Sequence, residues 1–345
     1  MQGFVNRLWY AKASVGYRLL ALALLPLCGL FYLVTATRRL LFRVGIKSAT
    51  QMPVPVIVVG NITVGGSGKT PTVIYLIELL RRHGYRPGVV SRGYGVDFNG
   101  VKSVLPGMPA REVGDEPAMI VARTQVPMVI GAKRVEACHA LLQAHDVDII
   151  ISDDGLQHYA LARDIELLIL DGERRFGNGY LLPAGPLREG RWRQQAVDFT
   201  LVNGDECQEG EWLMQLHAAQ WQPVKPPQGD GLSAAVFSVE PQAVAIAGIG
   251  NPQRFFNTLN QLGITTQKQH AFDDHHPLTL ADIDAIACGA QVLMTEKDAV
   301  KCREFAKQNW WYLPVDAKIA PQFEQQLIAQ LQQRKSVQQG NSNGV

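Results

Sequence analysis

Residues 56–71 read VIVVGNITVGGSGKTP, and this stretch decides the fold. Four β-branched residues precede Gly60 and predict a buried strand. The glycine-rich turn leads into residues 71–83, whose apolar positions recur with helical spacing and stop before Gly84. Strand, glycine-rich loop and helix in this order are the setting of a phosphate-binding loop. Glycines let main-chain N–H groups turn inward around phosphates, and the helix N-terminus adds its positive dipole end.

The predicted nucleotide-binding residues are the eight that form this turn: Thr63, Val64, Gly65, Gly66, Ser67, Gly68, Lys69 and Thr70. Lys69 would neutralise the β- and γ-phosphates of ATP, and the Thr70 hydroxyl would bind Mg²⁺. The usual pattern has glycine where this chain has Thr63, but the double glycine that follows can supply the same flexibility. A glycine-rich turn that binds no ligand is the alternative.

The rest of the chain continues the alternation of strands and helices, which predicts a mostly parallel sheet. The expected strands are 88–91, 126–130, 147–151, 165–170 and 199–202, with a helix at 134–145. Residues 203–235 are less apolar and contain three prolines, so we expect a connector there. A second alternation of strands and helices follows, with predicted strands at 244–247, 292–295 and 310–315 and predicted helices at 253–262 and 280–287.

The expected fold class is α/β: a P-loop NTPase-like domain with a mostly parallel sheet, a smaller C-terminal α/β lobe and an N-terminal membrane-associated helix. The expected boundaries are 1–50 for a basic and apolar N-terminal segment, 51–235 for the P-loop domain with its connector, and 236–335 for the C-terminal lobe. Residues 336–345 are polar and rich in Gly, Asn and Gln, which predicts a disordered tail.

The N-terminal segment differs from the rest of the chain in charge. The first fifty residues carry seven basic side chains and no acidic one, whereas the whole chain has a net charge of +2, so the remainder carries about −5. A basic arm on a mildly acidic body predicts contact with a polyanion, either nucleic acid or an anionic membrane leaflet. The five cysteines have no paired or metal-type spacing and indicate reduced thiols.

Residues 19–36 favour the membrane, because this run contains no charge and ends near Arg38 and Arg39. As a helix it would be about 27 Å long, just short of the ~30 Å hydrocarbon core. Pro26 would kink a spanning helix or let it lie obliquely. A cleaved signal peptide and a buried core helix are the alternatives, but export would separate the nucleotide loop from ATP. We expect no nucleic-acid partner and no obligate protein partner.

Two acidic motifs follow the loop along the chain. Asp153 and Asp154 come after the apolar run 147–151, where the carboxyl ends of parallel strands face the ligand, and this predicts carboxylates near Mg²⁺. A solvated turn is the alternative.

Asp115 and Glu116 precede Pro117, which suits a first helical position. A kinase needs a carboxylate to accept the proton of the acceptor hydroxyl, and this pair can supply it; otherwise Asp115 only caps a helix.

Two further sites carry weaker signals. Asp274 is followed by His275 and His276, so a carboxylate–imidazole pair can form there, although a surface turn is equally consistent with this pattern. Arg188 lies in a loop rich in Gly, Pro and Arg and can contact a transferring phosphate. A structural ion pair between Arg188 and a carboxylate is the alternative.

These motifs, in this order, resemble the tetraacyldisaccharide 4′-kinases of bacterial lipid A synthesis. The matching segments are GNITVGGSGKTP at 60–71, SRGYG at 91–95, GDEP at 114–117, DDGLQH at 153–158, LPAGPLRE at 182–189, FDDH at 272–275 and TEKDAVK at 295–301. The departure at Thr63 is itself part of the family pattern. The phosphate-binding loop alone is weakly specific, whereas the ordered set is strongly so.

The resemblance implies ATP- and Mg²⁺-dependent phosphorylation of the 4′-hydroxyl of a lipid-linked, tetraacylated glucosamine disaccharide 1-phosphate, which yields lipid IVA. It implies that Asp115 acts on the hydroxyl with help from His275, which is preferred to His276 because it directly follows Asp274. Glu116, Asp153 and Asp154 would surround the metal together with Thr70, and Arg188 would contact phosphate. The bacterial inner membrane is the expected location, with the catalytic domains on its cytoplasmic face.

A membrane-tethered P-loop ATPase or GTPase switch is the alternative from another functional class. The signature lysine of the deviant P-loop in that group would fall at position 64, which is Val64 here. A guanine-reading N-K-x-D motif also fails, because Asp298 directly follows Lys297 and stands one residue too early.

Overall fold

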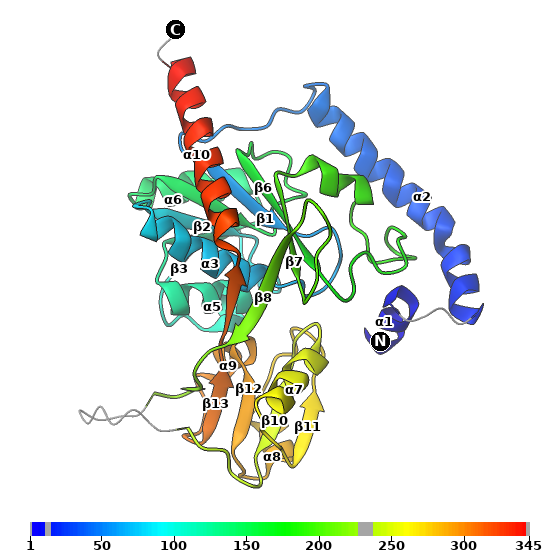
Figure 1. Ribbon diagram of the computed structural model, residues 1–345, viewed down its shortest axis with the longest axis vertical. Helices are drawn as coiled ribbons and strands as arrows, with labels where there is room; N and C mark the ends of the chain where they lie inside the picture. Colours follow the sequence, from blue (N-terminus) through cyan, green and yellow to red (C-terminus); the bar gives the residue numbers. More distant parts are fainter. Residues whose placement is uncertain (1, 11–14, 227–236, 343–345) are drawn as a thin grey trace.

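The computed structural model describes residues 2–10, 15–226 and 237–342, which form two sheets with their helices and an N-terminal helical segment (Figure 1). The larger sheet has nine strands in the order β14-β8-β7-β6-β1-β5-β2-β4-β3. Its strands are β1 Val56–Gly60, β2 Pro87–Ser91, β3 Val101–Val104, β4 Met128–Gly131, β5 Ile149–Asp153, β6 Ile165–Asp171, β7 Phe199–Asn203, β8 Trp212–Ala218 and β14 Val315–Ile319. β3 and β14 run antiparallel to their neighbours and the other pairings are parallel.

The strand β1 lies inside the sheet, between β5 and β6. Every residue of β1 is buried, as expected for a β-branched run in a parallel sheet that is covered on both faces. Val59 is in register with Asp153, so the glycine-rich loop after β1 and the carboxylates after β5 leave the sheet at the same edge. Ligands of open α/β sheets bind at this edge.

Helices cover both faces of this sheet. They are α3 Lys69–Arg82, α4 Ala110–Val113, α5 Asp115–Thr124, α6 Arg134–Ala144 and α10 Pro321–Ser342, with a 3₁₀ turn η1 at Arg191–Ala196. Ile57 and Val59 pack on one face with residues of α3, α5 and α10, whereas Val56 and Val58 pack on the other with residues of α6. The alternation follows from the two-residue period of a strand.

The smaller sheet has the strand order β11-β10-β12-β13-β9 and is parallel except for β9. Its strands are β9 Gln222–Pro223, β10 Val244–Ala247, β11 Lys268–Ala271, β12 Val292–Thr295 and β13 Trp310–Leu313, and its helices are α7 Pro252–Gln261, α8 Leu280–Ala287 and α9 Glu296–Cys302. The chain enters this lobe after β8 and leaves it through β14, and these two strands pair with each other. Figure 1 shows them side by side, with β8 running toward the smaller sheet and β14 running away from it.

The structure corrects three boundaries that the sequence predicted. The segment 203–235, expected to be a connector, contains β8 in the large sheet and β9 in the small one, while 227–236 lies outside the described residues. The strand expected at 310–315 is divided at Pro314 into β13 and β14, because proline cannot donate a ladder hydrogen bond and the chain changes sheets there. β14 and α10 therefore pack on the large sheet, although they were assigned to the C-terminal lobe 236–335.

The tail expected to be disordered from residue 336 is helical up to Ser342, the last residue of α10. The beginning of this helix packs through Phe323, whose ring contacts Phe199 and Trp212 at centroid distances of 5.3 and 5.7 Å. Aromatic residues at these positions of β7 and β8 therefore give the helix an apolar surface to cover.

The N-terminal segment forms two helices, α1 Gln2–Tyr10 and α2 Val15–Arg43. Figure 1 shows α2 running along one side of the large domain. Within it, Leu19–Arg43 is long and apolar enough to cross a membrane, and only 11% of its most apolar window is buried. The length and composition of this segment suit a helix that crosses a membrane. Its exposure favours a membrane-associated helix over a buried core helix.

Candidate active site

The glycine-rich loop between β1 and α3 is held by two asparagine side chains, one directly after β1 and one from β7. Asn61 Nδ2 donates to the Gly65 carbonyl oxygen at 3.2 Å and lies 3.3 Å from Ser67 Oγ. From β7, Asn203 Nδ2 donates to the Ser67 carbonyl oxygen at 3.2 Å. Gly68 has φ +97°, and a Cβ there would lie 2.7 Å from Asn203 Nδ2, so this position requires glycine. The loop can therefore keep its shape without a ligand.

The loop ends on the helix that carries its charged residue. Lys69 is the first residue of α3, and Thr70 follows it, half-buried, in the first turn. The main-chain N–H groups of a first helical turn have no partner within the helix, and they favour an anion. The structure thus brings the predicted nucleotide-binding residues together on one loop and one helix end.

A second group of charged residues follows β5. The Asp154 carboxylate lies 3.7 Å from Lys69 Nζ and 3.0 Å from Arg188 Nη1, so Arg188 does form the ion pair that was the alternative to a phosphate contact. Burial favours the neutral acid, but the charges of Lys69 and Arg188 outweigh it and lower the pKa of Asp154. Asp154 has φ +46°, a conformation that non-glycine residues seldom adopt and that recurs at functional sites.

The neighbouring Asp153 is in a different environment. Its carboxylate accepts a hydrogen bond from Ser91 Oγ at 3.0 Å, and no Lys, Arg or His side chain of the described residues lies within 4 Å of it. Burial, followed by the charge of Asp154, raises the pKa of Asp153 to about 6. A buried carboxylate without a cation is unfavourable, and a divalent cation would relieve this. The residues present therefore fit the predicted Mg²⁺.

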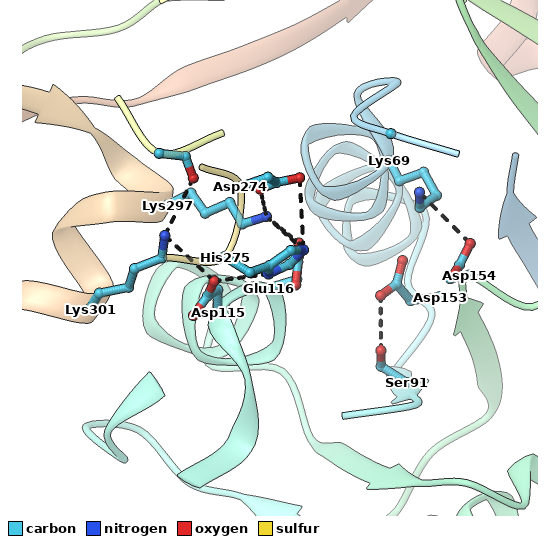
Figure 2. A network of polar contacts seen from close by, with 12 residues as sticks. Lys69, Ser91, Asp115, Glu116, Asp153, Asp154, Asp274, His275, Lys297 and Lys301 are labelled. Carbon is cyan, nitrogen blue, oxygen red and sulfur yellow. Dashed lines mark hydrogen bonds and ion pairs between the residues drawn. The ribbon is translucent and has the colours of Figure 1, made fainter. Parts of the chain in front are cut away.

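The predicted metal ligands are nevertheless divided between two clusters (Figure 2). Glu116 Oε1 lies 2.7 Å from Lys297 Nζ, away from the cluster of Asp153 and Asp154. Within the described residues, no group of three or more His, Cys, Asp or Glu side chains is arranged to hold a metal by itself. Mg²⁺ in proteins is usually bound through one or two carboxylates, water and substrate phosphates.

The cluster that contains Glu116 and Lys297 joins the two lobes. Asp115 begins α5, and its Oδ2 lies 3.2 Å from His275 Nδ1, which belongs to the smaller lobe. The residue that precedes the helix as its N-cap is Gly114, with φ +96°, so Asp115 does not cap α5. From α9, Lys301 Nζ lies 3.7 Å from Asp115 Oδ2. Figure 2 shows these side chains pointing toward one another from α5, α9 and the loop before α8.

The electrostatics of this cluster keep the carboxylate charged. Burial would raise the pKa of Asp115, but the hydrogen bond with His275 and the charges of Lys301 and Lys297 lower it overall. Conversely, the hydrogen bond with Asp115 raises the pKa of His275, in spite of burial and of the charge of Lys297. An ionised carboxylate held by an imidazole is the arrangement that a proton acceptor requires.

The structure distinguishes the two consecutive histidines. His275 has φ +61°, which turns its side chain toward Asp115, and its ring lies 5.2 Å from the ring of Tyr94. His276 instead stacks on Phe272 with the ring centroids 5.0 Å apart, and its Nε2 lies 3.6 Å from Asp282 Oδ2. Of these two histidines, His275 therefore contacts the Asp115 cluster and His276 does not.

Two lysines of this site were not assigned a role from the sequence, although they lie in the segment 295–301. Lys297 Nζ contacts Asp274 Oδ1 at 3.0 Å as well as Glu116, and Lys301 Nζ contacts the buried Asp298 Oδ1 at 3.1 Å. Residues four apart share one helix face, and Thr295-x-x-Asp298 is a helix-start pattern. These two signals together could have placed both lysines on one face of the same short helix.

The glycine-rich loop contacts the smaller lobe directly. A Cβ at Gly250 of the smaller lobe would lie 2.9 Å from Gly66 N in the glycine-rich loop. On the same side, Arg174 Nη1 donates to the Gly250 carbonyl oxygen at 3.2 Å. The loop, the acids after β5 and the Asp115–His275 pair thus surround one region between the lobes.

Comparisons with known proteins concern the chain as a whole. The family model described as tetraacyldisaccharide-1-P 4′-kinase matches residues 20–332. A tetraacyldisaccharide 4′-kinase of Shewanella loihica is 67% identical over 99% of this chain and all of its own length. The one of Shewanella woodyi is 62% identical over the whole of both chains. The crystal structure of LpxK from Aquifex aeolicus in complex with ATP superposes with a TM-score of 0.74 at 27% identity, covering 90% of this chain and 99% of the other.

Proposed function

The chain belongs to the tetraacyldisaccharide 4′-kinase family, and from this premise we propose that it transfers the γ-phosphate of ATP to the 4′-hydroxyl of a tetraacylated glucosamine disaccharide 1-phosphate. The product would be lipid IVA, a precursor of lipid A. The observation that carries the proposal is the placement of a phosphate-binding loop and an ionised carboxylate–imidazole pair around one region between the lobes.

Each residue of the proposed site has a separate role in the phosphoryl transfer. The Asp115 carboxylate accepts the proton of the 4′-hydroxyl while the hydroxyl oxygen forms a bond to the γ-phosphorus and the bond to the β–γ bridging oxygen breaks, which releases ADP. His275, 3.2 Å from that carboxylate, orients it. Lys69 of the loop and Arg188 both contact Asp154, and their charges would balance the charge of the phosphates.

Asp153, Asp154 and Thr70 are the residues that we propose to hold Mg²⁺, with Glu116 joining them only if its ion pair with Lys297 opens. When bound, the ion would balance the charge of the phosphate oxygens. The unpaired, buried carboxylate of Asp153 is the observation that supports this assignment.

Replacing Asp153 by asparagine tests this assignment without relying on activity. Asp153→Asn removes a charge whose burial outweighs the attraction of Lys69, so the melting temperature of the nucleotide-free protein at pH 7 should rise by a few degrees. Mg²⁺ should then no longer raise the melting temperature in the presence of a non-hydrolysable ATP analogue. A variant that keeps the full Mg²⁺-dependent increase would show that Asp153 is not a ligand.

The two histidines provide a matched pair for the proposed acceptor. His275→Gln should lower kcat by about tenfold to a hundredfold, because Asp115 loses the group that orients it, whereas His276→Gln should leave kcat within about twofold. Steady-state kinetics of both variants, with saturating ATP and lipid, measure the difference. Equal losses in the two variants would contradict the assignment of His275.

We propose that the bilayer is a partner of the protein and that the catalytic lobes lie on the cytoplasmic face of the bacterial inner membrane. The exposed, apolar Leu19–Arg43 and the basic N-terminal segment support this proposal. The acceptor is a lipid whose sugar lies at the membrane surface, and an enzyme that docks there meets it in two dimensions. We propose no nucleic-acid partner and no obligate protein partner.

The alternative of a membrane-tethered ATPase or GTPase switch is not favoured, because the relatives reported above are named as 4′-kinases. The decisive experiment is incubation of the full-length protein with γ-labelled ATP and a pool of lipid A precursors, followed by identification of the labelled lipid. Label on the 4′-phosphate of a disaccharide lipid is expected. Release of labelled inorganic phosphate without a labelled lipid would support the switch instead.

A further inference from the structure

One residue of the glycine-rich loop, Val64, is held from outside the loop through both its main-chain N–H and its carbonyl, which belong to two successive peptide units. Val64 N donates to the Pro186 carbonyl oxygen at 2.9 Å. The Val64 carbonyl oxygen accepts a hydrogen bond of 3.0 Å from the hydroxyl of Tyr10, the last residue of α1. A side chain of the N-terminal segment therefore contacts the backbone of the phosphate-binding loop directly.

This contact determines the direction of a main-chain donor. A trans peptide unit is planar, so the Val64 carbonyl and the Gly65 N–H point in opposite directions. When Tyr10 holds the carbonyl, the Gly65 N–H must face away from α1. Gly65 has φ +115°, a conformation that glycine adopts more readily than other residues, so Tyr10 restrains the peptide unit before a permissive position.

The helix that carries Tyr10 is itself docked on the large domain. Trp9 Nε1 donates to the Pro183 carbonyl oxygen at 3.1 Å, and Asn178 N donates to the Trp9 carbonyl oxygen at 2.8 Å. The Tyr10 ring lies 5.1 Å from the Arg174 guanidinium, which also reaches Gly250 of the smaller lobe. Burial raises the pKa of Tyr10 to about 12, so its hydroxyl remains a donor at neutral pH.

We propose that Tyr10 is a positioning residue for the nucleotide: by holding the Val64–Gly65 peptide unit it aims the Gly65 N–H at the phosphates of ATP. The docking of the N-terminal helix is thereby coupled to nucleotide affinity, and the segment that associates with the membrane also completes the nucleotide site. This inference rests on the proposed kinase function, since it assigns a further residue to the same site.

The substitution Tyr10→Phe removes the hydroxyl and keeps the ring against Arg174. Loss of one hydrogen bond predicts that the Kd of a non-hydrolysable ATP analogue with Mg²⁺ rises about threefold to tenfold. We expect the KM of the lipid to remain unchanged. Calorimetric titration of the full-length protein in detergent micelles measures the first quantity, and steady-state kinetics the second. Tyr32→Phe is the matched control, because Tyr32 is 53% exposed on α2 and should change neither value.

A second variant tests whether the docking of α1 acts through Tyr10. Trp9→Phe removes the hydrogen bond to Pro183 and should also weaken nucleotide binding. In the double variant with Tyr10→Phe the two losses should be less than additive, since both act through the same contact. Fully additive losses would contradict the coupling.

The outcomes separate this inference from the proposed function. Wild-type protein that binds no ATP analogue would overturn both. Wild-type binding together with an unchanged Kd in Tyr10→Phe would overturn only the role of Tyr10. A raised lipid KM with an unchanged nucleotide Kd would assign Tyr10 to the acceptor site, which also contradicts the proposal.

Discussion

Replacing Lys69 by alanine should abolish measurable phosphoryl transfer, a loss of about a thousandfold or more in kcat. Lys69 is the first residue of α3 and the only charged side chain of the glycine-rich loop 63–70. Its ammonium already lies 3.7 Å from the Asp154 carboxylate, in the region where the phosphates would bind. No other side chain of this loop can replace its charge. Transfer of γ-labelled phosphate to the lipid, followed over hours, measures the residual rate.

The control for this variant is Lys133→Ala. Lys133 is exposed and pairs with Glu136 on the surface, so its loss should leave kcat unchanged. Circular dichroism should show that Lys69→Ala remains folded, because Asp154 keeps its ion pair with Arg188. Turnover at the wild-type rate in a folded Lys69→Ala protein would exclude this loop as the phosphate site.

The substitution Asp115→Ala should lower kcat by about a hundredfold to ten-thousandfold, the range of a general base, while the Kd of ATP changes far less. Asp115 contacts His275 and Lys301 of the smaller lobe, and the groups of the phosphate-binding loop lie in the other cluster. Its removal should therefore affect the acceptor hydroxyl and spare the nucleotide. Single-turnover kinetics and equilibrium binding of an ATP analogue measure the two effects separately.

Two comparisons make the result interpretable. Asp115→Asn keeps the shape and a hydrogen bond to His275 but loses the basic carboxylate, and it should be as inactive as the alanine variant. Glu112→Ala, which loses a surface pair with Lys102, should behave as wild type. If ATP binding alone were weakened in Asp115→Ala, the residue would belong to the metal site instead.

The sequence by itself determined the central unit of the fold. The strand β1, the glycine-rich loop and α3 were predicted because their signals are local: a β-branched run, glycines that tolerate positive φ, and helical periodicity lie within thirty consecutive residues. The placement of Asp153 and Asp154 beside the loop was predicted too, because carboxyl ends of parallel strands share one edge. These inferences need only neighbouring residues and one general rule of topology.

Only the tertiary structure decided which distant side chains meet. The packing of α5 against α9 brings Lys297 to Glu116 and Lys301 to Asp115, and no local pattern predicts either pair. The preference for His275 over His276 was inferred from the adjacent acid, whereas the structure places His275 beside Asp115 and His276 beside Asp282.

The return of β14 and α10 to the large sheet was likewise missed, because Pro314 divides a run that appears continuous in sequence. Local conformational preferences act over a few residues. Contacts between residues 160 or more positions apart depend on how whole elements pack, and it is this packing that assembles the site from two lobes.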